Sequence, residues 1–176
     1  MKNTMKIYSF FLLLTAFLGC VDNCDTSLSE QTKKEFKEIQ AICEQYIENN
    51  IATTEYNGTA FCSCELMGID NNNIYLWIYC EEYYLKDNLL EKGSGLFEPI
   101  SLEMDKNNKV INYSLPREGM GYTNDLKIIF PKCIIESEDL IGNPSEEFTK
   151  KYYERGKSLG EKNLSKAKIY YKLNQK

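Results

Sequence analysis

Residues 60–84, AFCSCELMGIDNNNIYLWIYCEEYY, decide the fold that this sequence predicts. Two apolar segments flank an Asp/Asn-rich centre, the pattern of two strands joined by a turn near Asn71 or Asn72. Even-numbered positions would form one apolar face: Ala60, Cys62, Cys64, Leu66, Ile74, Leu76, Ile78 and Cys80. Odd-numbered positions would form an aromatic face: Phe61, Tyr75, Trp77, Tyr79 and Tyr83. We therefore expect a hairpin with a sulfur-rich core on one side and aromatic rings on the other.

A long amphipathic helix precedes this hairpin. Ser27 and Glu30 have the spacing of a capping box, which predicts the start of the helix. Apolar side chains then recur at helical spacing and would face the sheet: Phe36, Ile39, Ile42, Cys43, Tyr46 and Ile47. Asn49 and Asn50 are expected to end the helix. The stripe would bring Cys43 against the sulfur-rich face of the hairpin.

The cysteines are expected to be structural. Around the hairpin turn, Cys80 would lie opposite Cys62 or Cys64, and only one of these two can be its disulfide partner. The remaining one could then reach Cys43 on the helix. Cys62 and Cys64 have CxC rather than CxxC spacing, so neither a redox pair nor a zinc site is indicated. We predict core or disulfide roles for Cys43, Cys62, Cys64 and Cys80, and no metal or cofactor.

Further elements follow the first hairpin. Residues 86–95 are polar and contain two glycines, which predicts a mobile connection. A second hairpin is expected from residues 96–104 and 110–115 around an Asp/Asn-rich turn. Thr123 or Asn124 would cap a short helix over residues 125–130, which Pro131 would stop.

The C-terminal segment, residues 141–176, is basic and rich in tyrosine. Asn143, Pro144 and Ser145 predict the start of a helix that runs to Lys157, and Gly160 would interrupt it. A second helix is expected over residues 164–173, with a strand as the alternative because of Ile169, Tyr170 and Tyr171. From Lys150 onward there are nine basic and two acidic residues, whereas residues 20–149 carry 10 basic and 24 acidic residues. The acidic body argues against nucleic acid as a partner.

These elements predict an α+β fold, in which a long N-terminal helix packs on an antiparallel sheet of about four strands and a helical extension follows. The expected divisions are residues 1–19, 20–26, 27–140 and 141–176: a signal peptide, an anchor linker, the α+β domain and the extension. The order of one helix and four strands resembles cystatin-like folds. That resemblance concerns architecture alone and implies no inhibitory activity, because the Gln-x-Val-x-Gly loop of cystatin inhibitors is missing.

The N-terminus indicates export. Lys2 and Lys6 precede an apolar run that ends at Leu18, which is typical of a secretory signal. Residues 17–20, Phe-Leu-Gly-Cys, resemble the lipobox of bacterial lipoproteins, in which the cysteine is acylated. The resemblance implies a membrane anchor at Cys20 and an extracytoplasmic location, at the outer membrane or cell surface. An ordinary cleaved signal with an incidental cysteine is the alternative.

The composition excludes several kinds of catalysis. The chain has no histidine among its 176 residues, so Ser-His and Cys-His catalysis and His-ligated zinc are excluded. Glu81 and Glu82, with Glu65 or Glu103 nearby, could supply carboxylates for a glycoside hydrolase, but we favour the interpretation that they are solvated charges at a strand end. No catalytic motif is present, and we do not predict an enzyme.

The aromatic face is the main candidate for function. If it is open, its five aromatic side chains form a binding surface. If the tyrosine-rich extension covers it, the same side chains form a second core. Arg117 is a candidate anion contact, with a salt bridge inside its own turn as the alternative. We therefore expect a lipid-anchored binding or envelope-interaction module. The alternatives are an immunity-type lipoprotein that binds a basic toxin and, less favoured, a carboxylate hydrolase.

Overall fold

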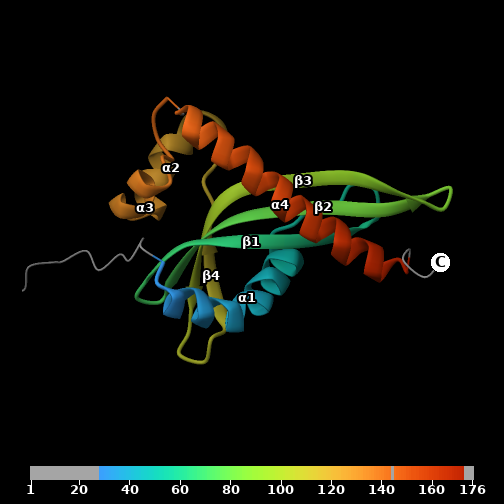
Figure 1. The fold of residues 1–176 in the computed structure, drawn as a ribbon, viewed down its shortest axis with the longest axis horizontal. Helices are drawn as coiled ribbons and strands as arrows, with labels where there is room; N and C mark the ends of the chain where they lie inside the picture. The colour runs from blue at the N-terminus through green and yellow to red at the C-terminus, as the bar shows by residue number, and fades with distance from the viewer. Residues whose placement is uncertain (1–27, 144, 173–176) are drawn as a thin grey trace, which may run out of the picture.

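The computed structural model describes residues 28–143 and 145–172, and it has the α+β architecture expected from the sequence (Figure 1). The segments expected to be the signal peptide and the anchor linker, with Cys20, lie outside these residues. A helix leads into four strands, which are followed by short helices and a long C-terminal helix. In chain order the elements are α1 (Glu30–Asn50), β1 (Thr59–Asp70), β2 (Asn73–Lys86), β3 (Leu89–Met104), β4 (Val110–Ser114), the 3-10 helix η1 (Gly119–Gly121), α2 (Tyr122–Ile129), α3 (Lys132–Ser137) and α4 (Glu146–Tyr170).

The four strands form one antiparallel sheet in the order β1-β2-β3-β4. The first hairpin turns at Asn71 and Asn72, where Asn71 adopts a positive φ of 52° that asparagine tolerates better than most residues. Its register places Cys62 directly opposite Cys80, and these two cysteines form a disulfide. A bulge at Met67 shifts the register near the turn.

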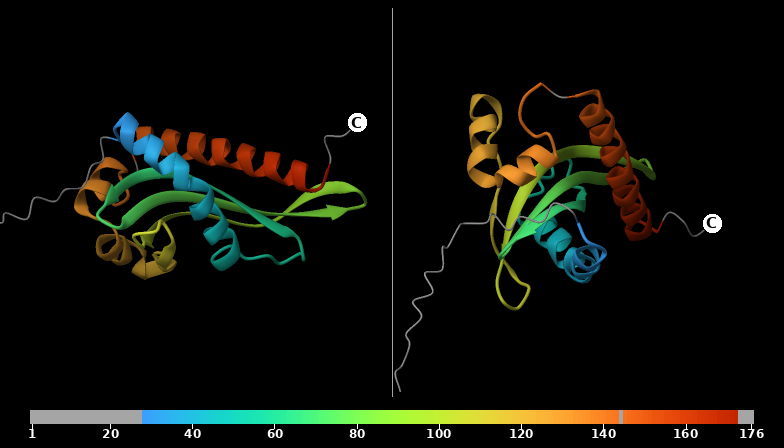
Figure 2. Two further views of the ribbon diagram at one scale, coloured as in Figure 1. Left: turned by 90° about the horizontal axis from the view of Figure 1, so that it is seen from below. Right: turned by 60° about the vertical axis from the view of Figure 1, so that its left-hand side comes forward.

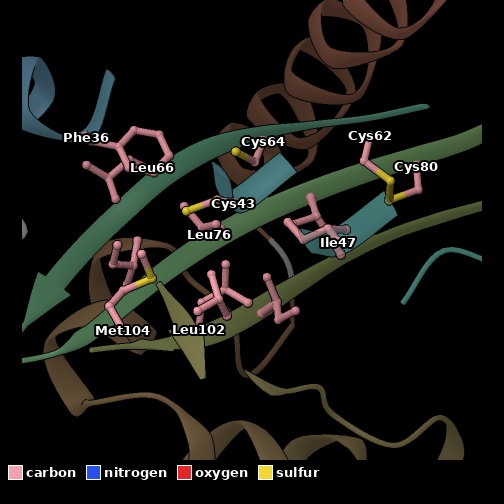
Figure 3. Packing of buried hydrophobic residues seen from close by; sticks show 14 residues of the cluster. Phe36, Cys43, Ile47, Cys62, Cys64, Leu66, Leu76, Cys80, Leu102 and Met104 are labelled. Atoms are coloured by element: carbon pink, nitrogen blue, oxygen red, sulfur yellow. A yellow bond between two sulfur atoms is a disulfide. The ribbon is translucent and has the colours of Figure 1, made fainter. Parts of the chain in front are cut away.

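The even-numbered face of the hairpin packs under α1. All four predicted core cysteines lie in this cluster, together with Phe36 and Ile47 of the helix and the aliphatic side chains of all four strands (Figure 3). Cys43 and Cys64 are buried free thiols. The helix begins later than the capping box predicted, because Ser29 rather than Ser27 is the N-cap and accepts from the backbone N–H of Thr32.

The connection expected over residues 86–95 is instead part of the sheet. β2 continues to Lys86, and β3 starts at Leu89 after a two-residue turn. Asp87 and Asn88 both have positive φ, as a type I′ hairpin turn requires. Backbone pairing with β2 thus orders a segment whose glycines and charges indicated a loop. The turned end of this hairpin projects beyond α4 (Figures 1 and 2).

The other face of the sheet is covered by the C-terminal helices (Figure 2). α4 packs on β1 and β2, while α2 and α3 cover the region around Tyr75 and Trp77. α4 is one continuous helix and not the two helices expected on either side of Gly160. Its N-cap is Ser145, whose hydroxyl accepts from the backbone N–H of Phe148. α2 and α3 replace the single short helix that the sequence predicted.

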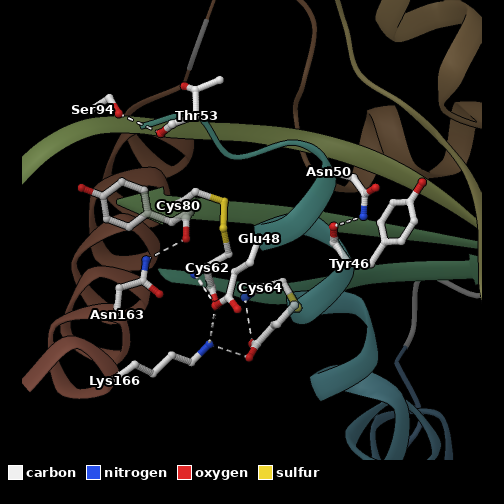
Figure 4. The surroundings of a disulfide bond; sticks show 12 residues. Tyr46, Glu48, Asn50, Thr53, Cys62, Cys64, Cys80, Ser94, Asn163 and Lys166 are labelled. Carbon is white, nitrogen blue, oxygen red and sulfur yellow. Dashed lines mark hydrogen bonds and ion pairs between the residues drawn. A yellow bond between two sulfur atoms is a disulfide. The ribbon is translucent and has the colours of Figure 1, made fainter. Parts of the chain in front are cut away.

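Side chains close the free edge of β1 (Figure 4). The backbone N–H of Cys62 donates to Glu48 at 2.9 Å, and that of Cys64 donates to Glu44 at 3.2 Å. The Lys166 ammonium donates to the carbonyl of Cys62 and, at 2.8 Å, to Glu44. α1 and α4 therefore satisfy the backbone groups that an edge strand would otherwise offer to another strand.

Candidate functional site

The aromatic face of the first hairpin is covered, so the structure has the second of the two arrangements that the sequence left open. Tyr75 and Trp77 lie in a cluster with α2, α3 and part of α4, and Trp77 is 3% exposed. Phe61 and Tyr83 are buried against the C-terminal end of α4. These four rings form a core layer. Tyr79, which is partly exposed, leads to the remaining open surface.

A groove remains between α4 and β3, with a volume of about 560 Å³. We call it the α4–β3 groove. It exists because α4 lies over β1 and β2 and meets β3 at Phe97, which leaves the neighbouring surface of β3 uncovered. Its walls come from three elements: Tyr79 of β2, Lys92 and Phe97 of β3, and Tyr152, Tyr153, Gly156, Lys157, Gly160, Glu161 and Leu164 of α4.

Two glycines allow α4 to approach the sheet at this groove. A Cβ at Gly160 would lie 2.8 Å from the ring of Tyr79, and one at Gly156 would lie 3.2 Å from the ring of Phe97. Aromatic rings therefore occupy the space where side chains of α4 would otherwise be. The sequence suggested that Gly160 breaks the helix, whereas glycines four residues apart can also mark a close-packed helix face.

The aromatic rings of the groove contact one another. Phe97 lies 4.6 Å from Tyr152 and 5.4 Å from Tyr79, measured between ring centroids. Tyr153 extends the aromatic surface outward and is 70% exposed. Such rings offer a large apolar contact area at a small cost in side-chain entropy, which suits them to binding.

The charged residues that line the groove are Lys92, Lys157 and Glu161, and the buried carboxylate of Glu81 bonds to two of the lining residues, Tyr79 and Lys92. Glu81 accepts hydrogen bonds from Tyr79 at 2.9 Å and from Tyr83 at 2.6 Å, and it pairs with Lys92 at 2.6 Å. Burial, reinforced by this carboxylate, raises the pKa of Tyr79 to about 12. Lys157 is exposed, and among the described residues it makes no ion pair. It is thus a cation available to a ligand.

The acidic residues that could have formed a hydrolase site are kept apart. Glu81 and Glu82 are neighbours on a strand and point to opposite faces. In the sheet register Glu65 is opposite Trp77 and Glu103 is opposite Asn73, so both lie further along the sheet. No pair of these carboxylates flanks a cleft in the way that glycoside hydrolysis requires.

Glu82 has a structural role. It is 1% exposed and accepts backbone N–H bonds from Glu55, Tyr56 and Gly58 at 2.7–2.9 Å and from Ser94 at 3.2 Å. Burial by itself would raise its pKa, but the four N–H donors outweigh burial and lower the pKa to about 2. A general acid needs the opposite shift.

Arg117 lies away from the groove, in the loop before η1. Its guanidinium makes two bonds of 2.8 Å to Asp125, one to each carboxylate oxygen, and its own backbone N–H also donates to Asp125. The arginine lowers the pKa of Asp125 to about 2. The sequence allowed a salt bridge inside the turn as the alternative to an anion contact, and the structure instead pairs Arg117 with the first turn of α2.

Two basic residues of α4 have structural roles that sequence analysis missed. Arg155 is 5% exposed, donates to Glu65 and Glu138 at 2.9 Å, and lies 5.2 Å from the ring of Trp77. Lys166 joins α4 to α1 at the edge of β1. Their spacing on the helix would have identified both residues as candidates for an inward face, had α4 been recognised as one helix.

Two features are absent from the part of the chain that the structure describes. Among residues 28–143 and 145–172, no group of three or more Cys, Asp or Glu side chains could hold a metal ion. No helix in those ranges is both long and apolar enough to cross a bilayer. Cys133 is disulfide-bonded.

Comparison of the chain with family models, with curated proteins and with solved structures finds no match in any of the three.

Proposed function

We propose that this protein is a lipid-anchored, extracytoplasmic binding module, and that the α4–β3 groove is its binding site. The observation that carries the proposal is the combination of partly exposed aromatic rings with an unpaired cation, Lys157, in one open groove. Concave apolar surfaces with a few polar groups are the usual form of ligand sites. The anchor part of the proposal rests on the lipobox-like sequence before Cys20.

Site-specific crosslinking in intact cells tests the groove. A photo-reactive amino acid in place of Glu161, an exposed residue of the groove one helical turn from Lys157, should give a discrete adduct with an envelope component, and Tyr153→Ala or Lys157→Glu should abolish that adduct. Glu154 is the matched control position for the photo-reactive amino acid, since it is a glutamate of the same helix and its side chain is 69% exposed. Equal adducts from both positions, or none from Glu161, would count against the groove as a binding site.

Fatty-acid labelling tests the anchor independently. The full chain should incorporate labelled palmitate in a bacterial host, and Cys20→Ala should not. Labelling that persists in Cys20→Ala would show that the acylated residue lies elsewhere. An unlabelled, freely secreted protein would support the cleaved signal peptide in place of the lipoprotein.

A further inference from the structure

The two edges of the sheet are treated differently. Side chains of α1 and α4 close the edge of β1, as described above. At the opposite edge, β4 pairs only with residues 101–104 of β3. Residues 89–100 of β3 therefore have β2 on their inner side and no strand on their outer side. In the described part of the chain, no other segment covers this edge with hydrogen bonds to the backbone of Gly95 or Phe97. An edge strand left open is a template for another strand.

The register shows which backbone groups of β3 face outward. Cys62 and Cys64 direct their backbone N–H groups away from β2, because Glu48 and Glu44 bind them. In an antiparallel ladder the hydrogen-bonding direction alternates along each strand. The residues opposite, Cys80 and Ile78, must therefore direct their backbone groups toward β3.

On β3 their partners are Leu96 and Glu98, which then bond inward to β2. Gly95 and Phe97 alternate with these residues, so their N–H and C=O groups face the open edge. Pro99 is next in the outward series and has no N–H to donate, which ends the stretch on one side. Next to Pro99, the carboxylate of Glu98 accepts from the Tyr122 hydroxyl at 2.8 Å, so α2 lies beside this end of the stretch.

The open edge and the α4–β3 groove share Phe97. Its backbone faces the edge, while its ring forms a wall of the groove. A strand that pairs with this edge would therefore carry its alternate side chains toward the aromatic rings of the groove, near Lys92 and Lys157. Peptide recognition by strand addition combines these two features, since backbone bonds supply affinity and pockets for alternate side chains supply specificity.

We propose that the groove binds an extended peptide segment that adds as a fifth strand to the Gly95–Phe97 edge of β3 and inserts an aromatic or branched apolar side chain beside Phe97. The segment carries an acidic residue close to that side chain, which pairs with Lys157. Charge favours this choice, because two lysines, Lys92 and Lys157, and one carboxylate, Glu161, line the groove, and Lys157 makes no ion pair among the described residues. The inference rests on the proposed function and names its ligand class.

A library of displayed linear dodecapeptides, selected on the full chain, tests this inference. The key variant is Gly95→Pro, which removes one outward N–H without touching the bonds to β2. Its matched control is Gly95→Ala, which keeps the N–H and places a Cβ at an ordinary 3.4 Å from the Cys80 carbonyl. Selected peptides should bind wild type and Gly95→Ala equally, and should lose about tenfold in affinity to Gly95→Pro. Lys157→Glu should lower the affinity of those selected peptides that carry an acidic residue.

The peptide supplies a second measurement, which needs no altered protein. Two methylated forms of a selected peptide would carry N-methyl groups either on the odd-numbered or on the even-numbered backbone nitrogens. One form should lose binding and the other should keep it, because only alternate amides of the peptide face β3. This measurement decides the matter if Gly95→Pro does not fold. Loss of binding by both methylated forms, or by neither, would overturn strand addition.

The remaining outcomes separate the inference from the proposed function. Peptides that tolerate Gly95→Pro but are lost with Tyr153→Ala would leave the groove as a binding site and overturn the added strand. If the library yields no peptide whose binding depends on Tyr153 or Gly95, the inference fails, whereas crosslinking from position 161 still tests the proposed function. A wild-type dimer that Gly95→Pro dissociates would make a second copy of the chain the occupant, and would also overturn the inference.

Discussion

At the scale of single residues, the most informative side chain is Glu82, a buried carboxylate that holds a loop onto the sheet. Its oxygens accept from the backbone of Glu55, Tyr56 and Gly58 on one side and of Ser94 on the other. Gly58 and Gly93 leave the room it occupies, because a Cβ at either position would collide with its side chain. The sequence indicated only an acidic pair at a strand end. It could not show that backbone donors from two distant segments converge there.

We predict that Glu82→Gln lowers the free energy of unfolding by about 1–3 kcal/mol near neutral pH, since the NH2 of the new amide would replace one carboxylate oxygen and would face backbone donors from which it cannot accept. Glu91→Gln on the same hairpin is the control, because Glu91 is exposed. Chemical denaturation of both variants measures the difference. Equal stabilities would show that the loop does not depend on the carboxylate.

The pH dependence of the same comparison has a defined sign. The folded-state pKa of Glu82 is about 2, below its ordinary value of 4.5, so ionisation of this group favours the folded state. Its contribution should be complete above pH 4.5 and should disappear as pH falls toward 2. The stability gap between wild type and Glu82→Gln should therefore narrow over that range, and a gap that widened would contradict the assigned pKa direction.

At the scale of elements, sequence patterns correctly predicted the strands and helices that depend on nearby residues. They failed for the elements whose form depends on contacts between distant parts of the chain. Alternating hydrophobicity around Asn71 and Asn72 predicted the first hairpin, because the core face fixes the register. The extension of β2 and β3 to Lys86 and Leu89 could not be predicted, since strand pairing overrides the glycines of that segment. The groove was likewise invisible, because it arises from where α4 crosses the sheet.

Gly160 illustrates the same limit within α4 and gives a prediction. Gly160→Ala would improve helix propensity by about 1 kcal/mol on an exposed helix. Here the added Cβ would lie 2.8 Å from the Tyr79 ring, so we expect a net destabilisation of about 1–3 kcal/mol instead.

A double-mutant cycle identifies the cause. Combining Gly160→Ala with Tyr79→Ala should remove the clash, so the alanine at position 160 should cost less in that background than in wild type. Thermal or chemical unfolding of the four proteins supplies the cycle. Stabilisation by Gly160→Ala alone would mean that α4 does not approach Tyr79 as closely as the structure has it.

At the scale of the whole molecule, the protein consists of one sheet with a core on each face. The sequence correctly predicted the α1 side, but it left open whether the C-terminal segment covers the aromatic side. α4 supplies that cover through apolar contacts and through Arg155, which joins Glu65 of β1 to Glu138 beside α3. The C-terminal segment is therefore a structural part of the domain and not an independent arm.

Truncation after Gly142 should remove that cover. Each large apolar side chain uncovered costs about 1.5–3 kcal/mol, and Trp77, Phe61 and Tyr83 all lose contacts with α4, so we expect a markedly lower melting temperature. Trp77 is the only tryptophan, and its fluorescence reports directly on this face. It should shift to longer wavelength and become accessible to acrylamide in the truncated protein.

Arg155→Met keeps α4 in the chain and provides the comparison. Methionine preserves the apolar contact with Trp77 but leaves Glu138 without its buried partner, so this variant should lose stability while its Trp77 stays shielded from acrylamide. Together the two variants distinguish the stability that comes from the ion pairs of Arg155 from the shielding of Trp77 by α4. If truncation changed neither the melting temperature nor the quenching of Trp77, α4 would not pack on the sheet in solution, and a groove between α4 and β3 could not be the binding site.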